Sequence, residues 1–286
     1  MLHQQHGRGV LAAKGCQTGQ FTDVFQIQLA QRGSGVQPQT DGLGRGGVGR
    51  GPGVDGLPER GKIFFLYLDA RRALLPTEGQ FASNVARELI FAASGKTAEQ
   101  LISDRDLYAS EEICELAQSF VRRRVAGEPM PYILGEWDFY GMTLTVTPDV
   151  LIPRDDTIAV TELAIKKALF LEQNPRILDL CTGSGCIGLA IARRVKDARV
   201  TLGDVSPAAL RVARQNVGSQ RLSGRVKCLT IDVRQPAAPF LGTFDLIVSN
   251  PPYVPESDRA AMHPNVRDHE PGLALFVPDD DAIRFY

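Results

Sequence analysis

Four short apolar segments in the second half of the chain constrain the fold most. Helical patterns, such as the one over residues 187–195, separate these segments, which span 176–180, 199–203, 226–231 and 244–249. Apolar runs of this length are typical of buried strands, and strands that alternate with helices form parallel sheets. The sequence therefore predicts an α/β fold with a doubly wound, Rossmann-like sheet and helices on both faces. Ligands of such sheets bind at the carboxyl ends of the strands.

The residues before this sheet show two other patterns. Residues 1–62 are rich in glycine and have neither strand nor helical periodicity, so we expect a disordered segment or a mistaken upstream translation start. A Gly/Arg-rich arm that binds RNA is the alternative, and we assign it no function. Apolar residues at three- and four-residue spacing predict a helical domain over 63–130. Helix starts are expected at Thr97 and Ser110.

A change of period marks the boundary between the helical domain and the sheet. Between residues 131 and 155 apolar residues alternate around a turn at Gly141, which predicts a β-hairpin linker. The sheet domain then spans 156–286. Its first helix is expected to be capped by the side chain of Asp156 or Thr157.

Composition narrows the class of partner. The net charge of −1 gives no overall field that would draw the chain onto a nucleic-acid backbone, so we expect no stable nucleic-acid binding. The five cysteines form no C-x-x-C pair and follow no secretory leader, which favours reduced thiols in a cytoplasmic protein. The longest apolar stretches fall far below the roughly 20 residues that span a bilayer. His263 and His269 lack a carboxylate-rich partner set, so we expect no metal.

A glycine-rich loop follows the first strand, and it is a candidate cofactor site made of Cys181, Thr182, Gly183, Ser184 and Gly185. Glycines let the backbone approach a ligand, and the helix that follows offers unpaired N–H groups. The G-x-G-x-x-G spacing also matches the dinucleotide fingerprint, so the loop alone does not identify the cofactor. Asp179 places a carboxylate near the loop, which suits the ammonium of a methionine moiety and would repel a pyrophosphate. We therefore predict S-adenosyl-L-methionine.

Two further aspartates end the next strands. Asp204 is placed to accept hydrogen bonds from ribose hydroxyls, a role that both cofactor classes need. Asp232 is placed to accept from the adenine amine, with Val233 packing on the ring. For either aspartate, a helix cap or a turn is the alternative interpretation.

The fourth strand ends in a motif that suits a planar nitrogen, Asn250-Pro251-Pro252-Tyr253. Two prolines fix φ and remove two N–H donors, which leaves the Pro251 carbonyl rigidly aimed. This carbonyl and the Asn250 oxygen can accept both hydrogens of an NH₂ group, while Tyr253 stacks on its flat face. Such acceptors localise the nitrogen lone pair and stabilise the positive charge that develops there. We therefore predict catalysis by Asn250, Pro251 and Tyr253. Pro252 joins them in binding substrate, and Asn250 also borders the cofactor.

Taken together, these motifs resemble the release-factor glutamine methyltransferases, the HemK/PrmC family, over roughly residues 66–286. The resemblance rests on RRRVAGEPMPYILGEWDFYG, VLIPR, LDLCTGSGCIGLAIA, GDVSPAAL, SNPPYVPESD and VRDHEP. It implies that residues 63–130 recognise a peptide chain release factor, and that residues 181–185, Asp204, Asp232 and Val233 contact S-adenosylmethionine. It also implies that residues 250–253 hold the glutamine of the Gly-Gly-Gln (GGQ) motif, whose amide N5 receives the methyl group.

Three departures from the family pattern carry expectations. Cys181 stands where the commonest family form has glycine, and tolerance is expected because only one neighbouring residue needs a positive φ. The linker reads PRDDT instead of P-R-P-E-T, which would shift how it lies over the cofactor. The family continues past Tyr286 into a helix and three strands. We therefore expect a fragment whose fourth strand is an open edge, with weak cofactor binding and little turnover.

Three rival functions remain open at this point. An N6-adenine DNA or RNA methyltransferase presents the same platform to a planar amine, although the near-neutral charge disfavours it. A ribosomal-protein glutamine methyltransferase can share the CTGSGC loop. A binding module without catalysis would require the fragment to be the natural product.

Overall fold

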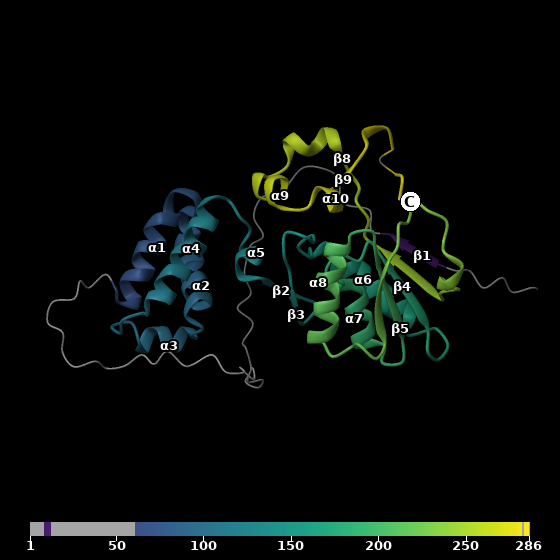
Figure 1. Cartoon of the computed structure of the whole chain (residues 1–286), viewed down its shortest axis with the longest axis horizontal. Helices are drawn as coiled ribbons and strands as arrows, with labels where there is room; N and C mark the ends of the chain where they lie inside the picture. The colour runs from purple at the N-terminus through teal and green to yellow at the C-terminus, as the bar shows by residue number, and fades with distance from the viewer. Residues whose placement is uncertain (1–8, 13–60, 282, 286) are drawn as a thin grey trace, which may run out of the picture. The chain divides into compact units, whose positions relative to one another are not determined.

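The computed structural model describes residues 9–12, 61–281 and 283–285. The chain divides into two compact units, one made of residues 16–121 and the other of residues 1–15 and 122–286 (Figure 1). Each unit is described by itself below.

The first unit is helical. It contains α1 (Ile63–Glu78), η2 (Gly79–Phe81), α2 (Ala82–Ser94), α3 (Ala98–Ser103) and most of α4 (Glu111–Val125). Apolar side chains three or four residues apart are buried in α1 and α2, among them Leu66, Ala70, Leu74, Ala86, Leu89 and Ile90. This spacing places them on one stripe of each helix, so the helical pattern predicted from the sequence is confirmed.

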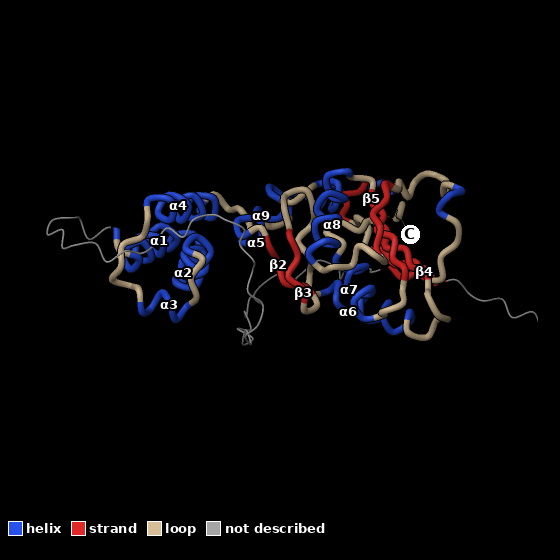
Figure 2. Tube along the Cα trace, turned by 60° about the horizontal axis from the view of Figure 1, so that its bottom comes forward, coloured by secondary structure: helices blue, strands red, loops and turns tan. Residues whose placement is uncertain are grey.

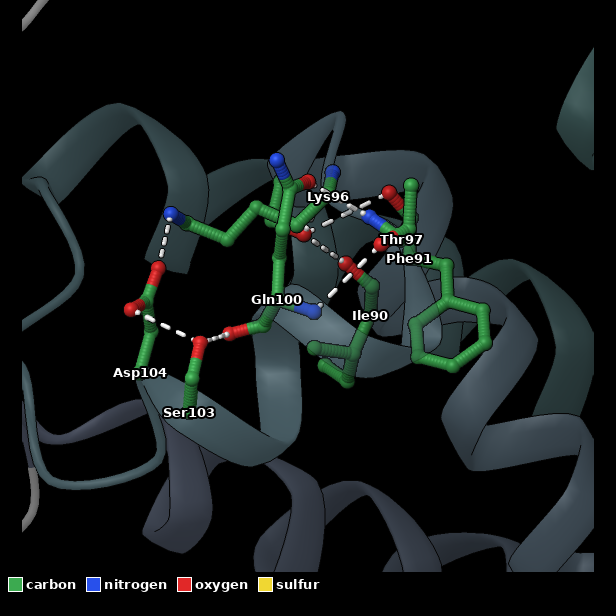
Figure 3. A network of polar contacts seen from close by, with 8 residues as sticks. Ile90, Phe91, Lys96, Thr97, Gln100, Ser103 and Asp104 are labelled. Atoms are coloured by element: carbon green, nitrogen blue, oxygen red, sulfur yellow. Dashed lines mark hydrogen bonds and ion pairs between the residues drawn. The ribbon is translucent and has the colours of Figure 1, made fainter. Parts of the chain in front are cut away.

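Local polar contacts fix the ends of the short helix α3 (Figure 3). The Thr97 hydroxyl accepts from the Gln100 N–H at 3.3 Å, and the Gln100 side chain accepts from the Thr97 N–H at 2.9 Å. Lys96 Nζ lies 2.7 Å from Asp104 Oδ2 beyond the other end of the helix. This reciprocal cap satisfies two of the free N–H groups of the helix start and confirms the start expected at Thr97. At α4, the predicted start is confirmed because the Ser110 hydroxyl accepts from the Ile113 N–H at 3.3 Å.

The second unit is built on a parallel sheet. Its strands are β4 (Arg176–Leu180), β5 (Arg199–Asp204), β6 (Val226–Thr230) and β7 (Leu246–Ser249), with the order β1-β7-β4-β5-β6. Helices α7 (Cys186–Arg194) and α8 (Pro207–Ser219) connect β4 to β5 and β5 to β6. The four strands expected from the apolar segments are present and parallel, so the predicted fold class is confirmed.

Helix placement differs in part from the prediction. Both crossovers move the same way along the sheet, so right-handed connections put α7 and α8 on one face. Together with α6 (Asp156–Ala168) they share a single core with the sheet, and Figure 2 shows α6 and α7 beside the red strands. Between β6 and β7 the chain forms loops and the short η3 (Pro239–Leu241) instead of an α-helix. Helices on both faces are therefore not seen among the elements that join these four strands.

The edge of the sheet at β7 also differs from the prediction. Residues Gly9–Ala12 form β1, which pairs in parallel with Leu246–Ser249. The sequence predicted no strand in residues 1–62 and an open edge at β7. A four-residue segment is too short for its periodicity to be recognised, and the unpaired backbone groups of an edge strand accept any extended segment that reaches them. The rest of residues 1–60 lies outside the described part of the chain.

A β-hairpin precedes the sheet, as predicted. After the short helix α5 (Met130–Leu134), β2 (Glu136–Phe139) pairs antiparallel with β3 (Met142–Thr145). The two turn residues, Tyr140 and Gly141, have φ angles of 48° and 71°, as a tight hairpin turn requires. Phe139, Met142 and Leu144 are buried in the core of the sheet.

The chain beyond β7 folds back on itself in short elements. They are β8 (Val254–Pro255), η4 (Glu256–Ala261), α9 (Pro264–His269), α10 (Gly272–Leu275), β9 (Phe276–Val277) and η5 (Asp279–Asp281). Strands β8 and β9 pair in parallel, which closes residues 254–277 into a compact segment. None of the helices in the described residues has the length and apolar character needed to cross a bilayer.

Candidate functional site

Strand register brings the two principal motifs to one edge of the sheet. Leu180, the last residue of β4, pairs with Gly203 of β5 on one side and with Ser249 of β7 on the other. The Ser249 hydroxyl also donates to the Leu180 carbonyl at 2.9 Å. Because the strands are parallel, Cys181 and Asn250 leave neighbouring strands at the same level. The glycine-rich loop and the N-P-P-Y motif are therefore side by side.

The glycine-rich loop has a more strained backbone than its sequence suggests. Cys181, Gly183 and Gly185 all have positive φ, at 55°, 54° and 86°. The expectation that Cys181 itself would escape this conformation is wrong. A side chain at a left-handed position costs about 1 kcal/mol relative to glycine, which explains why glycine is the commoner residue there. Backbone bonds from Thr182 N to Gly203 O (3.1 Å) and from Gly185 N to Thr182 O (2.8 Å) hold the loop in shape.

Two glycines of this region serve different purposes. A Cβ built on Gly183 would meet nothing within 4 Å, so the backbone there faces open space. On Gly188, by contrast, it would lie 2.3 Å from Leu202 Cδ2. Gly188 therefore lets α7 pack closely on the sheet, whereas Gly183 leaves room for a ligand above the loop. This arrangement fits a cofactor that lies against the loop backbone.

Asp204 ties this loop to the end of β5. Its two carboxylate oxygens accept from Gly183 N and Ser206 N, each at 2.9 Å. A carboxylate has about four acceptor positions, so two remain after these bonds. Asp204 is half-buried and is placed where it can still accept from the hydroxyls of a ribose.

Asp179 lies near the glycine-rich loop, as the sequence predicted. Its side chain is fully buried, and Oδ2 accepts from Thr182 Oγ1 at 2.6 Å and from Gly188 N at 2.9 Å. The Oδ1 atom has no partner among the described residues. Burial raises the pKa of Asp179 to about 7. The carboxyl group thus supports the loop from below, and its contact with a cofactor ammonium stays a prediction.

Asp232 lies at the end of β6 and is engaged by its own neighbour. Arg234 donates to both carboxylate oxygens, through Nε at 2.9 Å and Nη2 at 2.8 Å. These bonds lower the pKa of Asp232 to about 2, so the carboxylate is ionised at neutral pH. Val233 is partly exposed beside it, where a flat ring could pack.

The cysteines of the loop are unsuited to nucleophilic chemistry. Burial raises the pKa of Cys181 and of Cys186 to about 12, so both thiols stay protonated at neutral pH.

In the N-P-P-Y motif the Tyr253 ring is exposed, and the Asn250 side-chain amide forms a hydrogen bond. Pro251 and Pro252 are buried, whereas Tyr253 is 42% exposed. Asn250 is partly buried, and its Nδ2 donates a long hydrogen bond of 3.5 Å to Thr157 Oγ1. The Oδ1 atom of Asn250 is the side-chain acceptor that the predicted chemistry uses. The buried prolines hold the backbone of the motif rigid next to the loop.

Thr157 has a different role from the one predicted. Helix α6 begins at Asp156 with Asp155 at the cap position, and no side chain caps it. Thr157, which is 5% exposed, instead points its hydroxyl at Asn250. The sequence allowed a cap at Asp156 or Thr157, and neither forms.

Asn216 is a structural residue of the site that sequence reasoning missed. It is fully buried in α8, and its Nδ2 donates to the carbonyls of Ser184 (2.9 Å) and Thr145 (3.0 Å). Its Oδ1 accepts from Thr145 N at 2.7 Å. Asn216 thus joins the hairpin to the glycine-rich loop. The available signal was a polar residue in an otherwise apolar helical stripe, which demands buried partners.

Glu270 was also missed as an individual residue. Only 6% of it is exposed, and its carboxylate accepts from Ile152 N at 3.2 Å and from Arg154 Nη2. The sequence gave no local signal, because the partners lie more than 100 residues apart in the chain.

Family models match both units of the chain. Residues 66–135 match the model described as PrmC N-terminal domain, and residues 160–266 match the Methyltransferase small domain. The second match covers the glycine-rich loop and the N-P-P-Y motif.

Several curated relatives share one name. The release factor glutamine methyltransferase of Geobacter sulfurreducens is 37% identical over 222 residues, which cover 77% of this chain and 75% of the relative. Proteins of the same name from Bacteroides thetaiotaomicron and Bordetella pertussis are 40% and 47% identical. The match to the Bacteroides protein covers 63% of this chain and 66% of the relative. The match to the Bordetella protein covers 55% of this chain and 57% of the relative. The chain thus spans about two thirds or less of the length of several curated relatives.

The fold and the site define a class of protein. A parallel sheet with a glycine-rich loop after one strand and N-P-P-Y after its neighbour is the arrangement of an S-adenosylmethionine-dependent methyltransferase. The chain belongs to the release factor glutamine methyltransferase family.

Proposed function

We propose that this protein transfers a methyl group from S-adenosylmethionine to the side-chain amide N5 of the glutamine in the GGQ motif of peptide chain release factors. One observation carries the proposal. Leu180 of β4 pairs with Ser249 of β7, so the acceptor pair of Asn250 and Pro251 follows β7 at the level where the cofactor loop follows the neighbouring β4. The name release factor glutamine methyltransferase, which these relatives share, supports the choice of substrate.

The cofactor side of the site is assembled from backbone and carboxylates. When bound, S-adenosylmethionine supplies an electrophilic methyl group on its sulfonium. The open backbone at Gly183 and the free acceptor positions of Asp204 are suited to the body of the cofactor. Asp232 and Val233 extend the same edge of the sheet toward an adenine ring. The buried Asp179 holds Thr182 and Gly188 in place beneath them.

The substrate side orients a weak nucleophile. An amide nitrogen delocalises its lone pair into the carbonyl, so it attacks only when it is held in line and its positive charge is stabilised. The Asn250 Oδ1 and the Pro251 carbonyl oxygen each accept a hydrogen bond from one N–H of the glutamine side-chain amide. The exposed ring of Tyr253 packs on the plane of that amide. As the nitrogen–carbon bond forms and the sulfur–carbon bond breaks, the nitrogen releases one proton to solvent. The product is an N5-methylglutamine.

Residues 63–130 supply the helical part of the proposed protein. We assign them to recognition of the release factor, because this region matches a domain found in the same family. Its exposed apolar side chains include Phe81, Ile102 and Leu116, which can contribute to a protein contact.

The decisive experiment offers the chain three substrates under the same conditions. The protein is incubated with methyl-labelled S-adenosylmethionine and a release factor, total ribosomal protein, or duplex DNA. Mass spectrometry of the release-factor digest is expected to place one methyl group on the glutamine of the GGQ peptide. Label in ribosomal protein or DNA, with an unmodified GGQ peptide, would contradict the proposal.

A further inference from the structure

We infer that Thr157, Arg154 and Glu270 form a positioning relay that fixes the orientation of the Asn250 amide. The inference rests on the proposed function for its kinetic consequence. Its structural content stands on contacts between the linker, the N-P-P-Y motif and the segment that follows the motif. None of the three residues needs to touch substrate.

The relay begins at the Asn250 side chain. An asparagine amide has two nearly isosteric orientations, and only one of them points Oδ1 at an NH₂ donor. Thr157 Oγ1 lies 3.5 Å from Asn250 Nδ2 and accepts from it. This contact holds the Nδ2 side of the amide against α6, so Oδ1 stays available to substrate.

A backbone bond connects Thr157 to the second member. Thr157 N donates to the Arg154 carbonyl at 3.0 Å, at the turn that starts α6. A displacement of Arg154 therefore moves the Thr157 hydroxyl. The Thr157 carbonyl also accepts from Thr161 Oγ1 at 2.8 Å, which holds the first helical turn from the other side.

Glu270 anchors Arg154 from a distant part of the chain. Its side chain is 1% exposed and forms an ion pair with the Arg154 guanidinium, which is 39% exposed. The same carboxylate accepts from Ile152 N at 3.2 Å, so the linker is held at two points two residues apart. A buried carboxylate whose bonds go to one short linker sets the position of that linker. The segment after the N-P-P-Y motif thus determines where the partner of Asn250 lies.

Two further hydrogen bonds hold residues 150–153, the part of the linker just before Arg154. The Tyr132 hydroxyl donates to the Val150 carbonyl at 2.6 Å, and Trp137 Nε1 donates to the Pro153 carbonyl at 3.0 Å. Residues 150–153 are therefore held by Tyr132, Trp137 and Glu270. Arg154, which follows this segment, is also held by Glu270.

The first test removes only the hydroxyl of Thr157. Thr157→Val keeps the shape of the side chain, and Thr157→Ser keeps the hydroxyl. Thr243→Val is the matched control, because it removes a threonine hydroxyl at an exposed position outside the relay. We expect Thr157→Val to lower kcat for release-factor methylation about tenfold, because a hydrogen bond that orients a catalytic acceptor is lost. Thr157→Ser should stay within about twofold of wild type, as should Thr243→Val. The Kd for S-adenosylmethionine should be unchanged in all three variants.

The second test changes Glu270, the relay residue that lies furthest from Asn250 along the chain of contacts. Glu270→Gln keeps an acceptor for Ile152 N but loses the charge that holds Arg154. We expect it to lower kcat severalfold and to leave the cofactor Kd unchanged. Asp268→Asn is its control, because it removes a charge two residues away in an exposed ion pair with Arg267.

An activity-independent measurement separates this inference from the proposed function. The ¹⁵N side-chain amide signal of Asn250 is identified as the one missing in Asn250→Ala. It should shift in Thr157→Val and Glu270→Gln but not in Thr243→Val or Asp268→Asn. An unchanged signal in Thr157→Val overturns the relay whether or not a release factor is methylated. Where the wild type is active, a Thr157→Val rate within twofold of it also overturns the relay. A wild-type protein that leaves the GGQ glutamine unmodified overturns the proposed function, and the amide signal then decides the relay alone.

Discussion

The two halves of the candidate site are held in different ways. The cofactor loop is fixed by many short hydrogen bonds, including those of Asp179 and Asp204 to its backbone and hydroxyl groups. The N-P-P-Y motif depends on strand register, on two buried prolines and on a single long contact from Asn250 to Thr157. A loop that binds through its backbone needs a rigid shape. A motif that binds through one side chain needs that side chain turned the right way.

This difference predicts which property a substitution in each half of the site should change. Changes in the loop should alter stability and cofactor affinity, because its groups support one another. Changes at the motif should alter the rate and leave the fold intact. The predictions below test this separation, in order of decreasing effect.

Asn250→Ala should give the largest effect. It removes one of the two acceptors for the amide hydrogens, and loss of one such aimed group costs about 10²–10³-fold in kcat. The Kd for S-adenosylmethionine should change far less than kcat, although Asn250 also borders the cofactor. Steady-state methylation and calorimetric titration measure the two quantities, with Asn84→Ala in an exposed part of α2 as the control. Equal activity of Asn250→Ala and wild type would contradict the proposal that Asn250 accepts a hydrogen bond from the substrate amide.

Asp179→Asn should change the pH dependence of stability. The pKa of Asp179 is raised to about 7 from an ordinary value of 3.8. The contribution of this group to the free energy of unfolding is therefore complete below about pH 4 and is lost as the pH rises toward 7. Asparagine does not titrate. The free energy of unfolding of the variant minus that of wild type should therefore increase by about 2 kcal/mol between pH 5 and pH 8. Urea unfolding at both pH values measures it, and a difference independent of pH would contradict the buried placement.

Cys181→Gly should be more stable than Cys181→Ala by about 1 kcal/mol, because only glycine adopts a positive φ without strain. Both variants lose the thiol, so the comparison isolates the backbone. Thermal unfolding of the pair provides the measurement. Alanine as stable as glycine at this position would mean that residue 181 does not have a left-handed conformation in solution.

Removal of residues 1–12 should have the smallest effect. It deletes β1 and leaves the outer edge of β7 unpaired, so the amides of residues 246–249 should exchange with solvent faster. Exchange at the β4–β5 pair should be unaffected. Hydrogen exchange read by mass spectrometry compares the two regions. Identical protection at residues 246–249 with and without the segment would show that β1 does not pair there.

Much of the fold could be predicted because its signals are local. The apolar runs that became β4 to β7, the alternation around Gly141 and the helical spacing in α1 and α2 all follow from short-range patterns. The candidate site followed from motifs at strand ends, since parallel strands bring their carboxyl ends together.

The remainder depended on three-dimensional contacts. The bond between Glu270 and the linker joins residues 118 positions apart, which no periodicity reveals. Burial of Asp179 and the positive φ of Cys181 are set by how α7 packs on the sheet. The pairing of β1 with β7 depends on an edge created by other strands.

The most direct test of the central claim is a crystal structure with S-adenosylhomocysteine and a peptide that contains Gly-Gly-Gln. The account predicts that the glutamine amide nitrogen lies about 3 Å from both Asn250 Oδ1 and the Pro251 carbonyl oxygen, facing the sulfur of the cofactor product. A peptide bound with its glutamine away from these two oxygens would contradict it.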